Sequence, residues 1–329
     1  MIMMNNFSSP QEFLEELKST LANPARLRIG DSGFLKITNE QIRTNFPEAA
    51  DSIIKQNRAY DVLIKELRND IFAIMTSDMR DKINSNVAIG ALDTGEANAI
   101  IVRSLDWKFA ILINYGLMTL LNKYLKLTCA KANPRLVIYC NRKEASKLSS
   151  ADLQQYLEEL IENYKLYSGP YGPMIKLAES NQGMATVGLH LYLAELFIIC
   201  HELGHYLNGD LNNVANFSAY RELDWVHKFT GKPGHQKEHR ADLTGYELLQ
   251  KIVKKNNPQL PRHVLLQSIV LLCTLLSLIY GDELSYSHPS PTDRVLYIAE
   301  NYYGHDFAEN LRKGYEQPEL LESLWEKKD

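Results

Sequence analysis

The sequence is poor in cysteine, and the few cysteines it has exclude several protein classes. Only four of the 329 residues are cysteines, and no two of them have the Cys-x-x-Cys spacing of a zinc knuckle or a redox motif. They are Cys129, Cys140, Cys200 and Cys273. Most of them lie in apolar runs, as the reduced, buried thiols of cytosolic proteins do. We therefore expect neither a disulfide framework nor a cysteine-based zinc site.

An excess of basic residues is also absent. The 36 lysines and arginines are outnumbered by 40 aspartates and glutamates, so the formal net charge is −4. Proteins that bind nucleic acid normally show a basic stripe or a high isoelectric point. Apolar residues make up 45% of the chain and charged residues 23%, as in soluble globular proteins. We expect a globular protein without a nucleic-acid partner.

No apolar run clearly reaches the roughly 20 residues that a membrane-spanning helix needs. The most apolar window, residues 263–281, is interrupted by four polar residues, and no cluster of lysine or arginine follows it. Residues 1–19 carry acidic side chains where a signal peptide would be basic and apolar. We therefore predict a cytoplasmic protein with no membrane partner, and a buried core helix at residues 263–281.

Helical patterns dominate the chain. Apolar spacing and cap residues predict helices along most of its length. Residues 87–104 differ, because two β-branched runs flank a turn-like segment and so predict a β-hairpin. A short strand is predicted at residues 135–140. The fold class that we predict is mainly α (α+β). The expected helices start at Ser9-Pro10 and at Ser150, and others span residues 47–73, 105–125, 184–207, 237–253 and about 261–280.

Two histidines four residues apart lie near the end of the apolar segment 184–207. In the stretch ICHELGHYLNGD, His201 and His205 share one face of a helix, so both imidazoles can point at a single ion. Glu202 lies where a carboxylate can take a proton from a bound water without being a ligand. This geometry explains the His-Glu-x-x-His pattern of zinc hydrolases. A bare match also occurs by chance, so the rest of the chain must supply a third ligand.

The alternative is a core helix with two histidines satisfied by their neighbours. Such a helix would bury two imidazoles and a carboxylate among apolar residues, which is costly unless they are paired or bind a metal. Gly204 is unfavourable in a helix interior, but it leaves space beside the histidines. Local penalties of this kind are typical of functional sites. We therefore favour a metal site.

Residues 237–253 form a predicted helix that can complete this site. Glu238 would give the two-histidine, one-glutamate ligand set of catalytic zinc, which keeps one position open for water. Asp242, one turn further on, is suited to accept the proton on the second nitrogen of a ligand histidine. His235 and His239 are rival third ligands, ranked lower because neither has an acidic partner so well placed. One zinc ion is the expected cofactor.

A proline-rich segment at residues 285–294 supplies further candidates. His288 precedes a helix that Ser290 is suited to start. A donor such as His288 near the metal would stabilise the oxyanion that forms when water attacks a carbonyl. Tyr286 and Arg294 are candidates for contacts with the substrate or with the oxyanion. Taken alone, a histidine in such a segment is more often a surface or capping residue.

The motifs HELGH, EHRAD and SHPSPTDR occur in that order along the chain. Together they resemble the motifs of gluzincin-type metallopeptidases of the membrane-protease clan. The sequence is most similar to the soluble Lit-type phage-exclusion peptidases of bacteria. The resemblance covers the C-terminal half well, extends loosely to residues 87–125, and hardly reaches the N-terminal segment. It implies a zincin-like catalytic domain with a small β-sheet beside a buried active-site helix.

The resemblance also implies roles for individual residues and for the whole chain. It implies zinc ligation by His201, His205 and Glu238, proton transfer by Glu202, support from Asp242, and functional standing for His288 and Arg294. The implied activity is that of an intracellular endopeptidase in anti-phage defence. A protein or peptide substrate and a protein activator, either phage-derived or another protein, are the expected partners. Residues 86–329 would form the peptidase domain, and residues 1–85 an N-terminal helical or regulatory portion.

The expected mechanism follows from these parts. Zinc lowers the pKa of its water toward ~7 and polarises the scissile carbonyl. Glu202 takes the proton of the water and passes it to the leaving amine. His288 donates a hydrogen bond to the oxyanion. The strand-like residues 97–102 would bind an extended peptide along an edge, by analogy with β-augmentation.

Other functions fit parts of this pattern. Glu202-x-x-His205 is half of a di-iron carboxylate motif, but no other histidine has a glutamate three residues before it, so we discount that reading. A two-histidine, one-carboxylate iron site is a chemical alternative. A non-catalytic sensor or interaction protein that contains zinc is the non-enzymatic alternative. An open metal position and an available base favour catalysis, because structural zinc is normally closed by four protein ligands.

Overall fold

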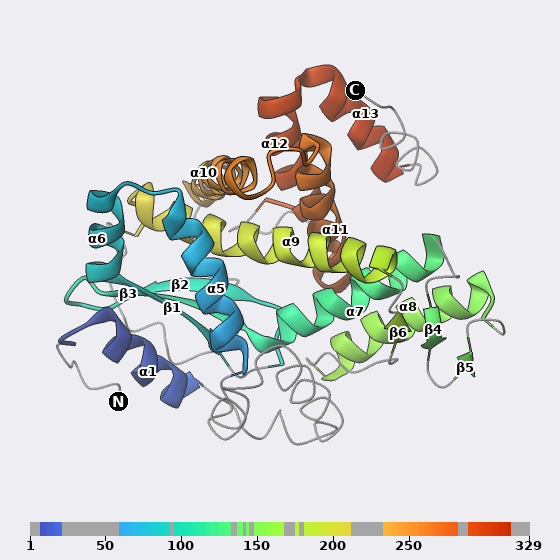
Figure 1. The fold of residues 1–329 in the computed structure, drawn as a ribbon, viewed down its shortest axis with the longest axis horizontal. Helices are drawn as coiled ribbons and strands as arrows, with labels where there is room; N and C mark the ends of the chain where they lie inside the picture. Colours follow the sequence, from blue (N-terminus) through green and yellow to red (C-terminus); the bar gives the residue numbers. More distant parts are fainter. Residues whose placement is uncertain are drawn as a thin grey trace. The chain divides into compact units, whose positions relative to one another are not determined.

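The structure, a computed structural model of the chain, is mainly α-helical with small β-sheets, and this confirms the predicted fold class (Figure 1). It describes residues 7–21, 59–92, 95–132, 137–140, 143–144, 148–167, 175–177, 181–211, 233–281 and 289–316. The chain forms two compact units, Met1–Leu189 and His190–Asp329. Helix α9 (Asn181–Leu207) begins in the first unit and ends in the second. The functional division expected between residues 85 and 86 stays a prediction.

The first unit combines helices with two small sheets among its described residues. In a mixed sheet of order β1-β3-β2, β1 (Val87–Leu92) runs parallel and β2 (Ala99–Arg103) antiparallel to β3 (Phe109–Asn114). An antiparallel sheet of order β5-β4-β6 consists of β4 (Val137–Cys140), β5 (Lys143–Glu144) and β6 (Ile175–Leu177). The helices are α1 (Pro10–Leu21), α5 (Ala59–Ala73), α6 (Ser77–Asn86), α7 (Tyr115–Ala132) and α8 (Ser150–Tyr167).

Two predictions for the first sheet are wrong. The hairpin expected in residues 87–104 does not form, because β1 and β2 both pair with β3 and not with each other. The long helix expected at residues 105–125 begins only at Tyr115, since Phe109–Asn114 are the central strand β3. All six residues of β3 are buried. A strand covered on both faces reads as a continuous apolar run, which periodicity cannot distinguish from a buried helix.

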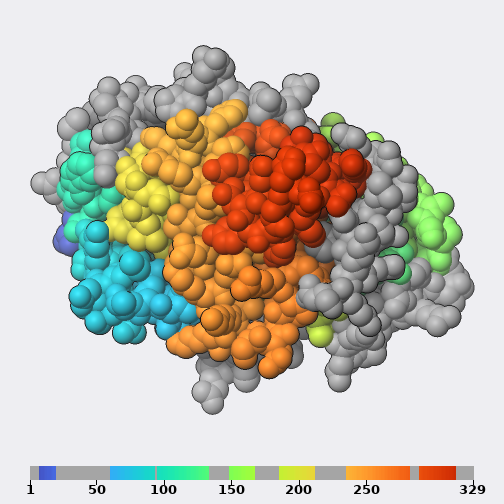
Figure 2. Space-filling model, turned by 90° about the horizontal axis from the view of Figure 1, so that it is seen from above, coloured from blue at the N-terminus to red at the C-terminus, as the bar shows by residue number. Residues whose placement is uncertain are grey.

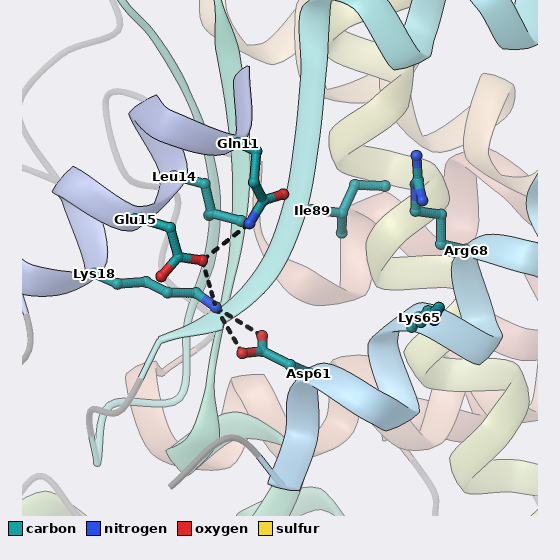
Figure 3. A pocket seen from close by; sticks show the side chains of 8 residues that line it. All are labelled: Gln11, Leu14, Glu15, Lys18, Asp61, Lys65, Arg68 and Ile89. Carbon is teal, nitrogen blue, oxygen red and sulfur yellow. Dashed lines mark hydrogen bonds and ion pairs between the residues drawn. The ribbon is translucent and has the colours of Figure 1, made fainter. Parts of the chain in front are cut away.

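A polar cleft of about 260 Å³ lies between α1 and α5 in the first unit (Figure 3). Within it, the amine of Lys18 on α1 lies 2.7 Å from both carboxylate oxygens of Asp61 on α5. Asp61 Oδ1 also accepts a hydrogen bond from the backbone N–H of Ala91 on β1, at 3.0 Å. A Cβ built on Gly90 would lie 2.9 Å from Leu14 Cδ2, so α1 packs closely on β1. This ion pair therefore ties two helices to one edge of the sheet.

The second unit is helical in its described residues. Helix α12 (Pro291–Tyr303) contacts α10 (Pro233–Asn256), α11 (Arg262–Tyr280) and α13 (His305–Glu316). Described residues of this unit form the continuous orange-to-red surface in Figure 2. The predicted start of α12 is confirmed, because the side-chain oxygen of Ser290 accepts a hydrogen bond from the N–H of Asp293 at 3.0 Å. This cap fixes where the helix that carries Arg294 begins.

Two helices in the described part of the chain are long and apolar enough, by length and composition alone, to cross a membrane. They are Ala185–Leu207, within α9, and Arg262–Tyr280, which is α11. A buried core helix passes the same test, and 67% of the most apolar window of the first helix is buried. The expected cytoplasmic location and the expected lack of a membrane partner stay predictions.

The burial of Glu195 on α9 should make the stability of the protein depend on pH. Burial raises the pKa of its carboxyl group from 4.5 to about 8. The folded protein therefore holds a proton that the unfolded chain releases, so the group costs nothing below pH 4.5 and stability falls as the pH rises toward 8. We expect Glu195→Gln to match the wild type at pH 4. At pH 8 it should be more stable by about 2 kcal/mol, which is less than the full shift would give, because the residue is only half-buried and water screens part of the effect.

Urea unfolding at pH 4, 6 and 8 measures this effect. Glu247→Gln is the matched control, because Glu247 is an exposed carboxylate that pairs with Lys251 at 2.7 Å. The control should show no gain in stability that grows with pH. A gain for Glu195→Gln that is the same at all three pH values would contradict a raised pKa.

Candidate metal centre

Helices α9 and α10 approach each other closely at two glycines. A Cβ built on Gly204 of α9 would lie 2.9 Å from the carbonyl oxygen of Ala241. A Cβ built on Gly245 of α10 would lie 2.9 Å from the backbone nitrogen of His201. Only glycine permits such an approach of one backbone to another. The two helices can therefore present side chains to a common point.

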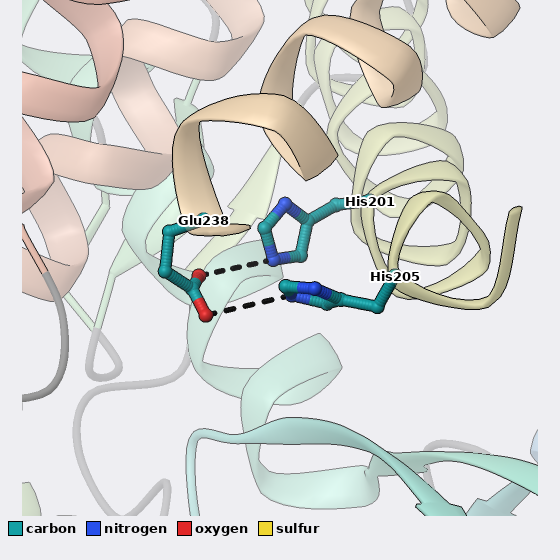
Figure 4. Close-up of side chains that lie close together, drawn as sticks. All are labelled: His201, His205 and Glu238. Carbon is teal, nitrogen blue, oxygen red and sulfur yellow. Dashed lines mark ion pairs between the residues drawn. The ribbon is translucent and has the colours of Figure 1, made fainter. Parts of the chain in front are cut away.

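His201, His205 and Glu238 meet at that point (Figure 4). Their ligand atoms all lie within 4.8 Å of one another. His201 Nε2 is 3.4 Å from Glu238 Oε2, and His205 Nε2 is 3.5 Å from Glu238 Oε1. The structure thus brings together the three residues predicted as ligands from two different helices. Two imidazole nitrogens and a carboxylate are a donor set that fits zinc and also fits iron.

The other ring nitrogen of His201 faces Asp242, as predicted. His201 Nδ1 lies 2.9 Å from Asp242 Oδ1, and the side chain of Asp242 is fully buried. Arg294 holds this carboxylate, with Nη2 at 2.6 Å from Oδ1 and Nε at 3.0 Å from Oδ2. Arg294 Nη2 also lies 3.1 Å from His201 Nδ1. The guanidinium is therefore engaged with Asp242, which favours a positioning role over the predicted contact with substrate.

Asp210 supports the second histidine, a role that the sequence interpretation missed. His205 Nδ1 lies 3.0 Å from Asp210 Oδ2. Gly209, with φ of 70°, ends α9 in a left-handed turn in which its N–H bonds to Tyr206 O and the N–H of Asp210 bonds to His205 O. This is the hydrogen-bond pattern of a Schellman cap, and it returns the chain to the last turn of the helix. The sequence does contain a signal for this contact, because Gly209, a residue suited to end a helix, follows the two histidines and is itself followed directly by Asp210.

Glu202 is buried beside the three candidate ligands and does not belong to their convergent group. Its Oε1 lies 4.0 Å from His201 Nε2, and only 8% of the residue is exposed. Burial raises the pKa of Glu202, and this outweighs the two histidines and Arg294, which lower it. A carboxyl group with a raised pKa can hold a proton between two steps of a reaction. This position is the one that the motif predicts for a general base.

The carboxylates around the histidines favour a bound cation. Burial lowers the pKa of His205, but hydrogen bonds to Asp210 and Glu238 outweigh it and raise the pKa to about 10. The pKa of His201 is raised as well, because Asp242 and Glu238 outweigh the effects of burial and of Arg294. Metal binding must displace these protons, so we expect proton release when a metal enters.

The structure describes two of the four remaining candidate residues, His235 and His239. His239 stacks on Tyr297 with ring centroids 4.1 Å apart. Neither His239 nor His235 belongs to the convergent group in the part of the chain that the structure describes. Tyr286 and His288 lie outside the described residues. Their predicted roles stay predictions.

Comparison with known protein families, with curated proteins and with solved structures finds no match for this chain. The resemblance to metallopeptidases therefore rests on short motifs.

Proposed function

We propose that the protein is a zinc-dependent endopeptidase that acts on an intracellular protein. The carrying observation is the buried group of His201, His205 and Glu238, in which each histidine has its own carboxylate partner. This donor set leaves a zinc ion one open position, as in catalytic rather than structural sites. Glu202 beside the group supplies the base that a hydrolase needs and that a structural site lacks.

Each residue of the site has a distinct task in this proposal. A zinc ion held there would lower the pKa of a water toward ~7 and polarise the peptide carbonyl. Glu202 accepts the proton of the attacking water and donates it to the leaving amine. Asp242 and Asp210 each accept the Nδ1 proton of a histidine, which keeps both Nε2 atoms available as ligands.

The substrate and trigger are proposed from the motif resemblance. It favours a host protein as substrate, a phage-derived activator and a role in anti-phage defence. His288 stays the proposed donor to the oxyanion. Strand β2 lies at one edge of its sheet, which supports the proposal that residues 97–102 bind an extended peptide by β-augmentation.

Two other functions fit the same donor set. A non-haem iron enzyme would use two histidines and one carboxylate with open positions. A sensor or interaction protein would hold the metal without catalysis. The buried Glu202, at 4.0 Å from a ligand nitrogen, favours hydrolysis over both alternatives.

Metal removal and replacement test this proposal. Purified protein should contain about one zinc per chain. Cleavage of a host protein, or self-cleavage, in extracts of phage-infected cells should disappear after chelation and return with zinc. Return of activity with ferrous iron alone would favour the iron enzyme. Stoichiometric zinc without any cleavage in infected cells would favour the sensor.

A further inference from the structure

Each histidine of the metal centre is connected to an arginine through an aspartate. His201 contacts Asp242, which Arg294 holds at 2.6 Å. His205 contacts Asp210, which Arg240 holds with Nη2 at 2.5 Å from Oδ1. The first arginine has 18% of its side chain exposed, whereas the second has 57% exposed. The second connection therefore runs from the metal centre to the protein surface.

Contacts on both sides of Asp210 hold its carboxylate against His205. Its side chain is only 2% exposed, and its two carboxylate oxygens are divided between His205 and Arg240. The amine of Lys237 donates a hydrogen bond to the backbone oxygen of Asp210 at 2.7 Å. Lys237 and Arg240 both lie on α10, which also carries the third ligand, Glu238. One helix thus supplies a ligand and also fixes the support of another ligand.

We propose that Arg240 is a positioning residue for the metal centre, although most of its side chain lies at the surface. It holds Asp210 Oδ1, so that Oδ2 faces His205 Nδ1 and His205 Nε2 faces Glu238, where it would bind the metal. This inference rests on the proposed metal centre, but it does not require that the protein cleave peptides. It also means that a protein or small molecule that binds Arg240 would weaken metal binding without contacting any of the metal-binding residues.

Positioning and simple charge repulsion predict opposite effects for the loss of Arg240. Removal of a positive charge near a divalent cation should tighten metal binding, by no more than about threefold for an exposed and screened group. Loss of positioning should weaken it, because removal of partners that orient a ligand typically costs 10- to 100-fold in metal affinity. The sign of the change therefore separates the two roles.

Zinc affinity and the stability of the zinc-free protein are the two readouts. Zinc affinity is measured by competition with a chromogenic chelator, and the melting temperature is measured in excess chelator. For Arg240→Gln we expect affinity about tenfold weaker and at most a small fall in the melting temperature, because the Arg240 end of the ion pair is 57% exposed and water can take the place of its N–H groups. Arg240→Lys keeps a charged donor and should recover part of the affinity. Asp210→Asn should weaken binding at least as much as Arg240→Gln.

Lys251→Gln is the matched control. Lys251 lies on the same helix, is 56% exposed and forms an ion pair with Glu247, but it is about 2.5 turns beyond Asp242 and about 3.6 turns beyond Glu238. It should leave zinc affinity unchanged. Unchanged or tighter zinc binding by Arg240→Gln would overturn the proposal. A melting temperature so low that the variant is partly unfolded during the zinc titration would also overturn it, because unfolding would then explain the lost affinity. A wild-type protein that binds no zinc would instead refute the proposed function.

Discussion

Replacing Glu202 with glutamine should abolish peptide cleavage and leave the zinc in place. Glutamine has nearly the same shape as glutamate, but it cannot accept a proton from water. A positioned general base contributes about 10²- to 10⁴-fold to a reaction rate, so we expect the rate to fall about 10³-fold. Glu202 is not one of the three residues whose ligand atoms converge, so zinc content should not change. Cleavage in infected cells and metal analysis of the same variant provide the measurement.

The stability of this variant separates lost chemistry from lost structure. Burial raises the pKa of Glu202, so its ionised form is a cost that the neutral amide does not carry. In excess chelator at pH 8, Glu202→Gln should therefore melt at or above the temperature of the wild type. Cleavage that survives the substitution would sink the assignment of Glu202 as base. Joint loss of cleavage and zinc would make Glu202 a ligand.

Gly245→Val should disrupt the metal centre without changing any charged or ligating side chain. A Cβ at this position would lie 2.9 Å from the nitrogen and 3.0 Å from the Cα of His201. Backbone atoms of a packed helix cannot rotate away, so α10 must move from α9 and carry Glu238 with it. We expect a loss of about 3 kcal/mol in the free energy of unfolding. Zinc affinity should fall by about 100-fold, because ligand placement is lost.

Gly188→Val is the matched control for Gly245→Val. Gly188 lies on α9, and a Cβ built there meets nothing within 4 Å. The same substitution should therefore leave both zinc affinity and stability close to those of the wild type. Chelator competition and urea unfolding measure both variants. Wild-type zinc affinity in Gly245→Val would show that the close approach of the two helices does not position Glu238.

The group of three candidate metal ligands could be predicted from the sequence because the key spacings are local. His201 and His205 are four residues apart in one helix, so their shared face follows from helix geometry. Glu238 and Asp242 repeat this spacing on a second helix, which identifies them as a pair. That this helix lies against α9 depends on the glycines at both contact points, and spacing alone does not reveal which glycine meets which backbone.

The contact between Asp210 and His205 could not be predicted from spacing along the chain. It lies five residues after His205, a spacing that places two side chains on different faces of a continuous helix. Gly209 ends the helix in a left-handed turn and brings Asp210 back to His205. The contact of Arg240 with Asp210 adds a second helix, which only the packed structure places there.

Some features of the fold likewise follow from local sequence, and others depend on contacts between distant residues. The sequence by itself determined a mainly helical protein, the start of α12 at Ser290 and the face that carries the two histidines, because neighbours within a few residues decide these features. Only the tertiary structure decided that residues Phe109–Asn114 form a central strand, that β1 and β2 both pair with it, and that Asp210 and Arg294 support the histidines. The physical reason is that strand pairing and burial depend on residues far apart in the chain, whereas helical spacing does not.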